Sequence, residues 1–297
     1  ITESLPIISL VVVGFLLKQA KVLKVEDGAL FSKLILYITL PSVIFLSISQ
    51  ADVEPAHLLL LAFFGFLIAL VLRFISGGAT RLLKLENSIA GVVILCSMVM
   101  NIGSLMYPVI NTVYGAEGVS RTAAFDIGNS LMASGYGYYI ATRFGSREPF
   151  SLKGSLKKVL AVPVVWAVVL GLAVNLTGIT SPAFLVKILT PLGAANAPLA
   201  MIALGVFVNF EFPRWKLLVM TVFFRIGLGF LAGLSIVLLA GLQGLDRTVV
   251  LMASAMPSGM VPLVYAAAEG LDTEFAAACI SLSIVVGVLI TPVLLIF

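Results

Sequence analysis

Apolar runs long enough to cross a lipid bilayer follow one another along nearly the whole chain. A bilayer core requires about 20 apolar residues per helix. Ten segments approach or exceed this length, at roughly 4–20, 28–49, 55–76, 87–111, 117–142, 157–177, 182–207, 214–240, 247–268 and 273–297. Only 11% of the 297 residues are charged, whereas a soluble domain has about a quarter. We therefore expect an all-α membrane protein and exclude soluble enzymes, nucleic-acid binders and secreted disulfide scaffolds.

The basic residues predict the topology. The longest polar stretch, residues 143–158, divides the chain into a first five-helix repeat (1–143), a cytoplasmic linker (144–156) and a second five-helix repeat (157–297). Lys and Arg concentrate in cytoplasmic loops of membrane proteins. One side holds Arg121, Lys187 and Arg247. The other holds Lys18, Lys21, Lys24, Arg73, Arg81, Lys84, Arg143, Arg147, Lys153, Lys157, Lys158, Arg214 and Lys216. This bias predicts a multi-pass protein of the plasma or inner membrane with both termini outside the cytoplasm.

The two halves of the chain share helix-breaking residues at a nearly constant spacing. At an offset of 157 residues, Pro6 matches Pro163, Gly14 matches Gly171, Pro41 matches Pro198 and Glu54 matches Glu211; at 156, Met100 matches Met256 and Gly103 matches Gly259. A repeat with an odd number of spans inserts in the inverted orientation when it is duplicated, as in many secondary transporters. We therefore expect two inverted five-helix repeats.

Two of the apolar segments contain helix-breaking clusters at equivalent positions. The fourth reads Asn101-Ile-Gly-Ser-Leu-Met-Tyr-Pro108 and the ninth reads Met256-Pro-Ser-Gly-Met-Val-Pro262. Breaks survive in lipid only where protein or a watery cavity covers the freed backbone groups, and paired broken helices indicate a transport site. Half-helix N-termini there suit an anionic group. The predicted substrate-binding residues are Asn101, Gly103, Ser104, Pro108, Pro257, Ser258, Gly259, Met260, Val261 and Pro262.

These same motifs resemble the auxin efflux carrier family. The resemblance includes Asn101 to Pro108, Tyr114-Gly-Ala-Glu-Gly118 and Phe125-Asp-Ile-Gly-Asn129, together with the ninth-segment cluster; Leu40-Pro-Ser-Val-Ile-Phe45 and Ala197-Pro-Leu-Ala200 extend it over nearly the whole chain. The family includes plant auxin carriers and bacterial permeases assigned to malonate, malate or similar anions. This chain lacks the long hydrophilic central loop of many plant members and is more similar to a compact bacterial carrier.

The resemblance implies a fold shared with bile-acid/sodium symporters and sodium/proton antiporters. In that fold, spans 4 and 9 are broken and cross at the centre. Spans 1, 2, 6 and 7 form a scaffold, often a dimer surface, and spans 3–5 and 8–10 form the moving unit of an elevator-type mechanism. A homodimer is therefore expected.

Three further polar residues inside the spans are candidates for ion coupling. Asp126 lies midway along the fifth span with Asn129 on the same helix face, and an ionisable residue at that depth is a functional candidate by default. Asp126 could bind a proton, share a cation with Asn129, or be a structural partner of Arg121. Arg225, midway along the eighth span, could balance a substrate carboxylate or form an ion pair with Asp126.

The leading hypothesis is a secondary transporter of a small organic anion, such as a dicarboxylate or an auxin-like carboxylate. The alternatives are a sodium-coupled symporter of the bile-acid type and a membrane receptor without transport. An enzyme is disfavoured because the sequence shows no nucleophile–base pair and no metal-ligand cluster. We expect no cofactor and no metal.

Overall fold

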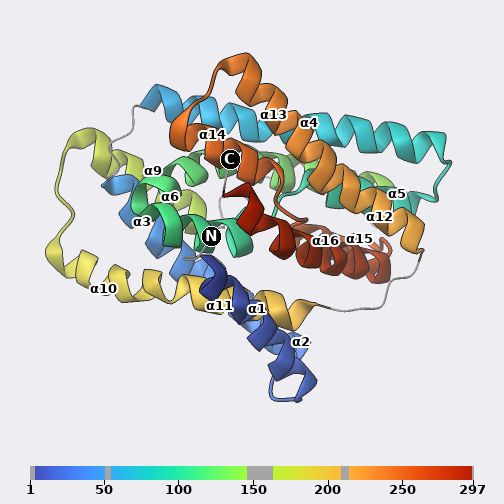
Figure 1. Cartoon of the computed structure of the whole chain (residues 1–297), viewed down its shortest axis with the longest axis horizontal. Coiled ribbons are helices and arrows are strands. Elements are labelled where there is room, and N and C mark those ends of the chain that lie inside the picture. Colours follow the sequence, from blue (N-terminus) through green and yellow to red (C-terminus); the bar gives the residue numbers. More distant parts are fainter. Residues whose placement is uncertain (1–3, 51–54, 146–162, 209–213, 296–297) are drawn as a thin grey trace. The chain divides into compact units, whose positions relative to one another are not determined.

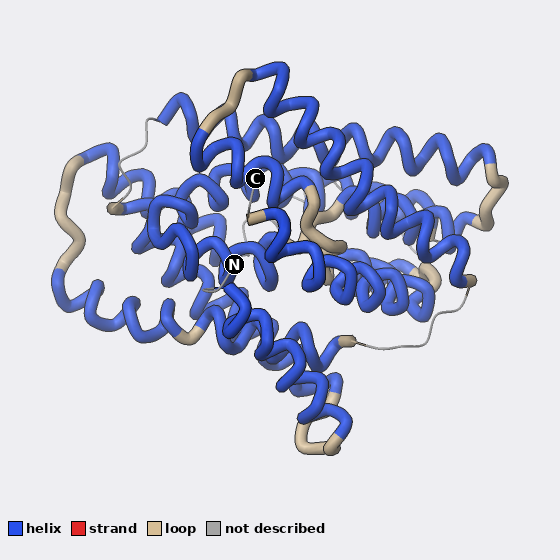
Figure 2. The backbone as a smooth tube through the Cα atoms, in the orientation of Figure 1, coloured by secondary structure: helices blue, strands red, loops and turns tan. Residues whose placement is uncertain are grey.

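The computed structural model describes residues 4–50, 55–145, 163–208 and 214–295 (Figure 1). Within these ranges the regular elements are helices, and the only strand-like feature is an isolated antiparallel bridge between Met100 and Ser258 (Figure 2). The predicted all-helical class is therefore confirmed for the described residues. The predicted linker 144–156, except its first two residues, and the matched pair Glu54 and Glu211 lie outside them.

The contacts of the chain divide it into two compact units. The first unit comprises Ile1–Leu59, Gly103–Ala124 and Leu160–Val208. The second unit comprises Leu60–Ile102, Phe125–Val159 and Asn209–Phe297.

The helices of the first unit are α1 (Ser4–Gln19), α2 (Val25–Leu34), α3 (Leu40–Ser49), α9 (Pro163–Thr177), α10 (Ala183–Ala194) and α11 (Asn196–Phe207). Those of the second are α4 (Pro55–Leu82, from Leu60 onwards), α5 (Asn87–Met98), α7 (Gly137–Phe144), α12 (Trp215–Val222), α13 (Gly229–Ala240), α14 (Gly244–Ser254), α15 (Val261–Glu269) and α16 (Thr273–Leu294). Helix α6 (Tyr107–Leu131) contributes to both units. Four π-helical turns, Ile35–Thr39, Ile102–Met106, Met132–Tyr136 and Phe223–Leu228, connect helices along the described chain.

Helix α6 is interrupted at Gly115, which has φ +57° and ψ −148°. A residue with a Cβ atom is strained at such a φ. Glycine has none and is therefore the residue expected there. The interruption lies between the predicted fourth and fifth segments, which were expected to end at 111 and to begin at 117. It kinks α6 at this place.

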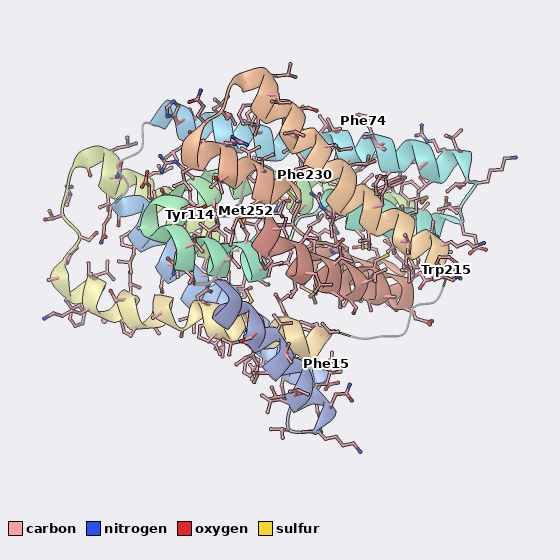
Figure 3. The ribbon with its side chains drawn as sticks, in the orientation of Figure 1. Phe15, Phe74, Tyr114, Trp215, Phe230 and Met252 are labelled. Atoms are coloured by element: carbon pink, nitrogen blue, oxygen red, sulfur yellow. The ribbon has the colours of Figure 1, made fainter. Side chains whose placement is uncertain are left out.

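The surface of the described helices is strongly apolar. Four helical stretches are long and apolar enough to cross a membrane, namely His57–Leu82, Ala183–Phe207, Trp215–Ala240 and Thr273–Leu294. Figure 3 shows Phe74 and Trp215 on α4 and α12, and these side chains are 60% and 62% exposed. Large apolar patches are rare on soluble monomers, but they are stable against lipid. The structure is thus consistent with a membrane protein.

Helices of the first unit pack in two corresponding pairs, α1 on α11 and α9 on α3. In the first pair a Cβ on Gly14 would collide with the backbone of Ile202, and in the second a Cβ on Gly171 would crowd Ile48 at 3.0 Å. Glycine is therefore required for close approach in both pairs. Between them, Thr39 Oγ1 donates a hydrogen bond of 2.9 Å to Asn196 Oδ1.

Glycines also bring helices of the second unit together. A Cβ on Gly128 of α6 would collide with the backbone of Ala62 in α4. On α13, a Cβ at Gly229 or Gly233 would collide with Ser254 of α14. This close packing places the end of α14 deep inside the unit.

Candidate functional site

Helices α5 and α14 both end inside the second unit, and the extended residues that follow them pair with each other. The Asn101 N–H donates to the Pro257 carbonyl at 2.8 Å, and the Gly259 N–H donates to the Val99 carbonyl at 3.1 Å. We call residues 99–101 and 255–260 the paired break. In the absence of water, each of these backbone groups would cost several kcal/mol if it were left unsatisfied. The two hydrogen bonds between the segments satisfy some of these backbone groups.

The sequence explains why the helices stop here. Pro257 and Pro262 lack an N–H group and clash with the preceding turn of a helix, and α15 begins one residue before Pro262. Gly259 permits close approach, because a Cβ there would lie 3.0 Å from the Met100 carbonyl oxygen. Gly287 of α16 does the same for the Pro257 ring, which a Cβ would meet at 2.7 Å. The predicted break in the ninth segment therefore has a clear steric basis.

Ser258 connects the paired break to two neighbouring helices. Its hydroxyl donates to the Cys96 carbonyl of α5 at 2.6 Å, and its N–H donates to the Ser283 hydroxyl of α16 at 3.1 Å. Ser258 is 1% exposed. The Ser258 hydroxyl thus satisfies a carbonyl at the end of α5.

Asn129 of α6 is hydrogen-bonded to the other segment of the paired break, residues 99–101. Its Oδ1 accepts from the Met100 N–H at 3.1 Å, and its Nδ2 donates to the Met100 carbonyl at 3.5 Å. The same Nδ2 donates to the Asp126 carboxylate at 2.8 Å. Asp126 is therefore connected to the residue next to Asn101 through one amide side chain.

Arg225 lies in the π-helical turn Phe223–Leu228 and is fully buried. Its Nε donates to the Met256 carbonyl at 3.0 Å and its Nη1 donates to the Ser97 carbonyl at 3.0 Å. Its Nη2 donates to the Ser254 carbonyl. A single guanidinium therefore caps the C-terminal ends of both α5 and α14. Hydrogen bonds from a charged donor are the stronger class, and cations are favoured at helix C-termini.

The structure brings together Asn101, Pro257, Ser258 and Gly259 of the predicted substrate-binding residues. Met260, Val261 and Pro262 follow directly and form the start of α15. Gly103 and Ser104 lie in the turn Ile102–Met106 and Pro108 at the start of α6, all grouped with the first unit. The place of these last three residues in a site remains a prediction.

Two of the alternatives for the charged residues, an ion pair of Asp126 with Arg121 and one of Asp126 with Arg225, are not seen in the described part of the chain. Among the described residues, neither Asp126 nor Arg225 takes part in an ion pair, and Arg121 pairs with Glu117 at 3.0 Å. Backbone carbonyls carry no sequence signal, so the carbonyl ligands of Arg225 were not foreseen. Ser283 was also missed, and a lone serine on an apolar helix offers no distinguishing pattern.

No group of three or more His, Cys, Asp or Glu side chains comes together in the described ranges. Both cysteines, Cys96 and Cys279, are buried with free thiols. The polar groups of the paired break are therefore amides, hydroxyls and backbone, with one guanidinium at the helix ends.

Comparisons with known proteins identify the family of the chain. A family model described as membrane transport protein matches residues 1–295. The chain is 30% identical to an uncharacterized transporter of Methanothermobacter thermautotrophicus, with 97% of this chain and 95% of the relative covered.

An uncharacterized transporter of Methanocaldococcus jannaschii is 28% identical, covering 96% of this chain and 94% of the relative. The uncharacterized transporter YfdV of Escherichia coli K12 is 25% identical, covering 98% and 95%. The family is one of membrane transporters and not of enzymes. The chain belongs to the membrane transport protein family, the family of the auxin efflux carriers.

Proposed function

We propose that the protein is a secondary transporter that moves a small organic anion across the membrane. The observation that carries this proposal is the paired break, in which two discontinuous helices meet through the backbone of Asn101 and Pro257. Transporters built from discontinuous helices bind substrate at such breaks, with half-helix N-termini directed at anionic groups. Family membership supports transport, and the chemistry of the break supports the anion.

The charge of the site favours an anion over a cation. Residues 96–104 and 252–262 contain no charged side chain. The nearby Asp126 carboxyl, which is bonded to Asn129, is neutral when it holds the proposed coupling proton and then does not repel an anionic substrate. Helix α15 begins at Val261, and the positive end of its dipole lies at the paired break. The Asn101 side chain is 3% exposed and supplies an amide donor nearby. Partial charges of this kind bind a carboxylate without holding it as tightly as a full countercharge.

We further propose an elevator-type mechanism in which the second unit carries the site. The division into two units supports this, because α1–α3 and α9–α11 belong to one unit while α5, α7 and α12–α16 belong to the other. Residues 103–124 group with the first unit, so the proposed moving part excludes the end of the fourth segment and the beginning of the fifth.

An inverted repeat is part of the same proposal. Two interactions join residues at the predicted offsets, Thr39 with Asn196 at 157 and Asn101 with Pro257 at 156. An interaction between equivalent residues is expected where a two-fold axis relates two repeats. The homodimer, the plasma-membrane location and the outward termini stay predictions.

For coupling, we propose that Asp126 binds a proton that moves with the substrate. Asn129 would transmit the change, since its amide contacts both the Asp126 carboxylate and the Met100 backbone. Sodium coupling of the bile-acid type is the alternative, and imposed ion gradients separate the two.

The test of the function is uptake by reconstituted vesicles. Purified protein in liposomes should accumulate at least one of a panel of radiolabelled carboxylates above the level of protein-free liposomes. Imposed pH and sodium gradients, each applied alone, would identify the coupling ion. Absence of uptake across monocarboxylates, dicarboxylates and aromatic carboxylates would contradict the proposal.

A further inference from the structure

The carbonyl oxygens around Arg225 form a cluster that chemically suits a monovalent cation. These carbonyls, on Ser97, Ser254 and Met256, come from the ends of two different helices and surround one guanidinium, and each accepts from a different nitrogen. In transporters with broken helices, unwound carbonyls and half-helix C-termini coordinate sodium ions. Here a guanidinium occupies the place where such an ion would bind.

The charges balance without a soluble ion. Each helix C-terminus carries about half a negative elementary charge, so α5 and α14 together present about one. The single positive charge of Arg225 matches this sum. Because the side chain is fully buried, the match occurs in a medium of low dielectric constant, where an unbalanced charge would be costly.

The local backbone is adapted to hold the guanidinium. Arg225 lies in a π-helical turn, a feature that is frequent at functional sites. Gly229 lies on the next turn, and a Cβ there would come within 2.6 Å of Arg225 Nη2. A residue larger than glycine would therefore displace the guanidinium from the carbonyls.

We infer that Arg225 is a tethered cation that fills a latent monovalent-cation site at the C-terminal ends of α5 and α14. The protein consequently holds its paired break together without sodium at this place. Removing the side chain should open a carbonyl-lined site that accepts free guanidinium or, more weakly, a sodium ion. This inference is independent of the substrate and of the proposed transport function.

The experiment is thermal unfolding of the detergent-purified protein in chloride salts of sodium, potassium and N-methylglucamine at equal ionic strength. Any rise in Tm from N-methylglucamine to sodium should be larger for Arg225→Ala than for the wild-type protein. Arg225→Ala should lose about 5 °C or more, and low concentrations of guanidinium chloride should restore part of that loss in a saturable manner. Arg214→Ala is the matched control, because Arg214 is half-exposed and paired with Asp272; its Tm should not respond to guanidinium.

Arg225→Lys and Arg225→Gln keep the test decisive if Arg225→Ala does not yield folded protein. Lysine retains the positive charge, and glutamine retains hydrogen-bond donors without it. The Lys variant should have the higher Tm of the two. A Gln variant as stable as the Lys variant, or an Arg225→Ala protein that guanidinium does not stabilise, would each overturn the inference. None of these readouts depends on transport.

Discussion

Thr39 and Asn196 lie 157 residues apart and share a hydrogen bond of 2.9 Å between Oγ1 and Oδ1. The spacing equals the offset at which glycines and prolines of the two halves match. Both residues are buried, and each directly precedes or begins one of two corresponding helices, α3 and α11. A polar contact of this kind fixes the register of the packed helices, because a shifted register would leave both groups unsatisfied.

The hydrogen bond predicts energetic coupling between the two residues. Thr39→Val and Asn196→Ala should each lower the Tm, since a buried group left unsatisfied costs about 1–3 kcal/mol. The double variant should lose less than the sum of the single losses, by about 1 kcal/mol. Strictly additive losses of stability in this double-mutant cycle would contradict the contact.

Asn101→Ala should weaken substrate binding without unfolding the protein. The substitution removes the amide but keeps the backbone N–H that donates to Pro257, so the paired break is retained. We expect about a tenfold increase in the concentration of anion needed for half-maximal uptake, equivalent to about 1.4 kcal/mol. Asn87→Ala, at an exposed amide in the first turn of α5, is the control and should behave like wild type. Equal substrate dependence in the two variants would remove Asn101 from the site.

Ser258 should act mainly through stability, although it was predicted as a substrate-binding residue. Its hydroxyl is bonded to the Cys96 carbonyl at 2.6 Å, so Ser258→Ala leaves that buried carbonyl without this donor. The expected loss is about 1–3 kcal/mol of unfolding free energy. Thermal unfolding and uptake measured on the same preparation check this. A variant with wild-type Tm and greatly weakened substrate binding would instead place the hydroxyl on the substrate.

Some features of the fold and the site can be predicted from the sequence, and others cannot. The breaks after α5 and α14 follow from local chemistry, because proline and glycine act on their own backbone wherever they lie. The common face of Asp126 and Asn129 follows from helical spacing. The ligands of Arg225 do not follow, because any residue supplies a carbonyl and only the tertiary packing selects Ser97, Ser254 and Met256.

Of two other features, one could have been predicted from the sequence and the other could not. The Thr39–Asn196 contact could have been found by applying the 157-residue offset to polar residues as well as to glycines and prolines. The four π-helical turns could not have been predicted from the sequence, because residues such as Ile35–Thr39 have the apolar composition of an ordinary buried helix. An inserted residue in a helix depends on its packing partners.

Asp126→Asn should separate transport from proton coupling. The amide keeps the shape of the side chain and cannot titrate, so substrate binding should persist while uptake loses its response to an imposed pH gradient. Glu117→Gln is the matched control, because Glu117 is an exposed carboxylate on the same helix that pairs with Arg121. Its uptake should keep the wild-type response. A folded Asp126→Asn protein with wild-type gradient dependence would exclude Asp126 as the coupling group.

Carboxylate uptake into proteoliposomes tests the central claim most directly. With an inward proton gradient and no sodium present, the wild-type protein should concentrate a labelled small carboxylate, and collapsing the gradient should abolish the accumulation. Uptake that requires a sodium gradient and ignores pH would contradict proton coupling. Failure to move any carboxylate under either gradient, by protein shown to be folded, would contradict the assignment as an organic-anion transporter.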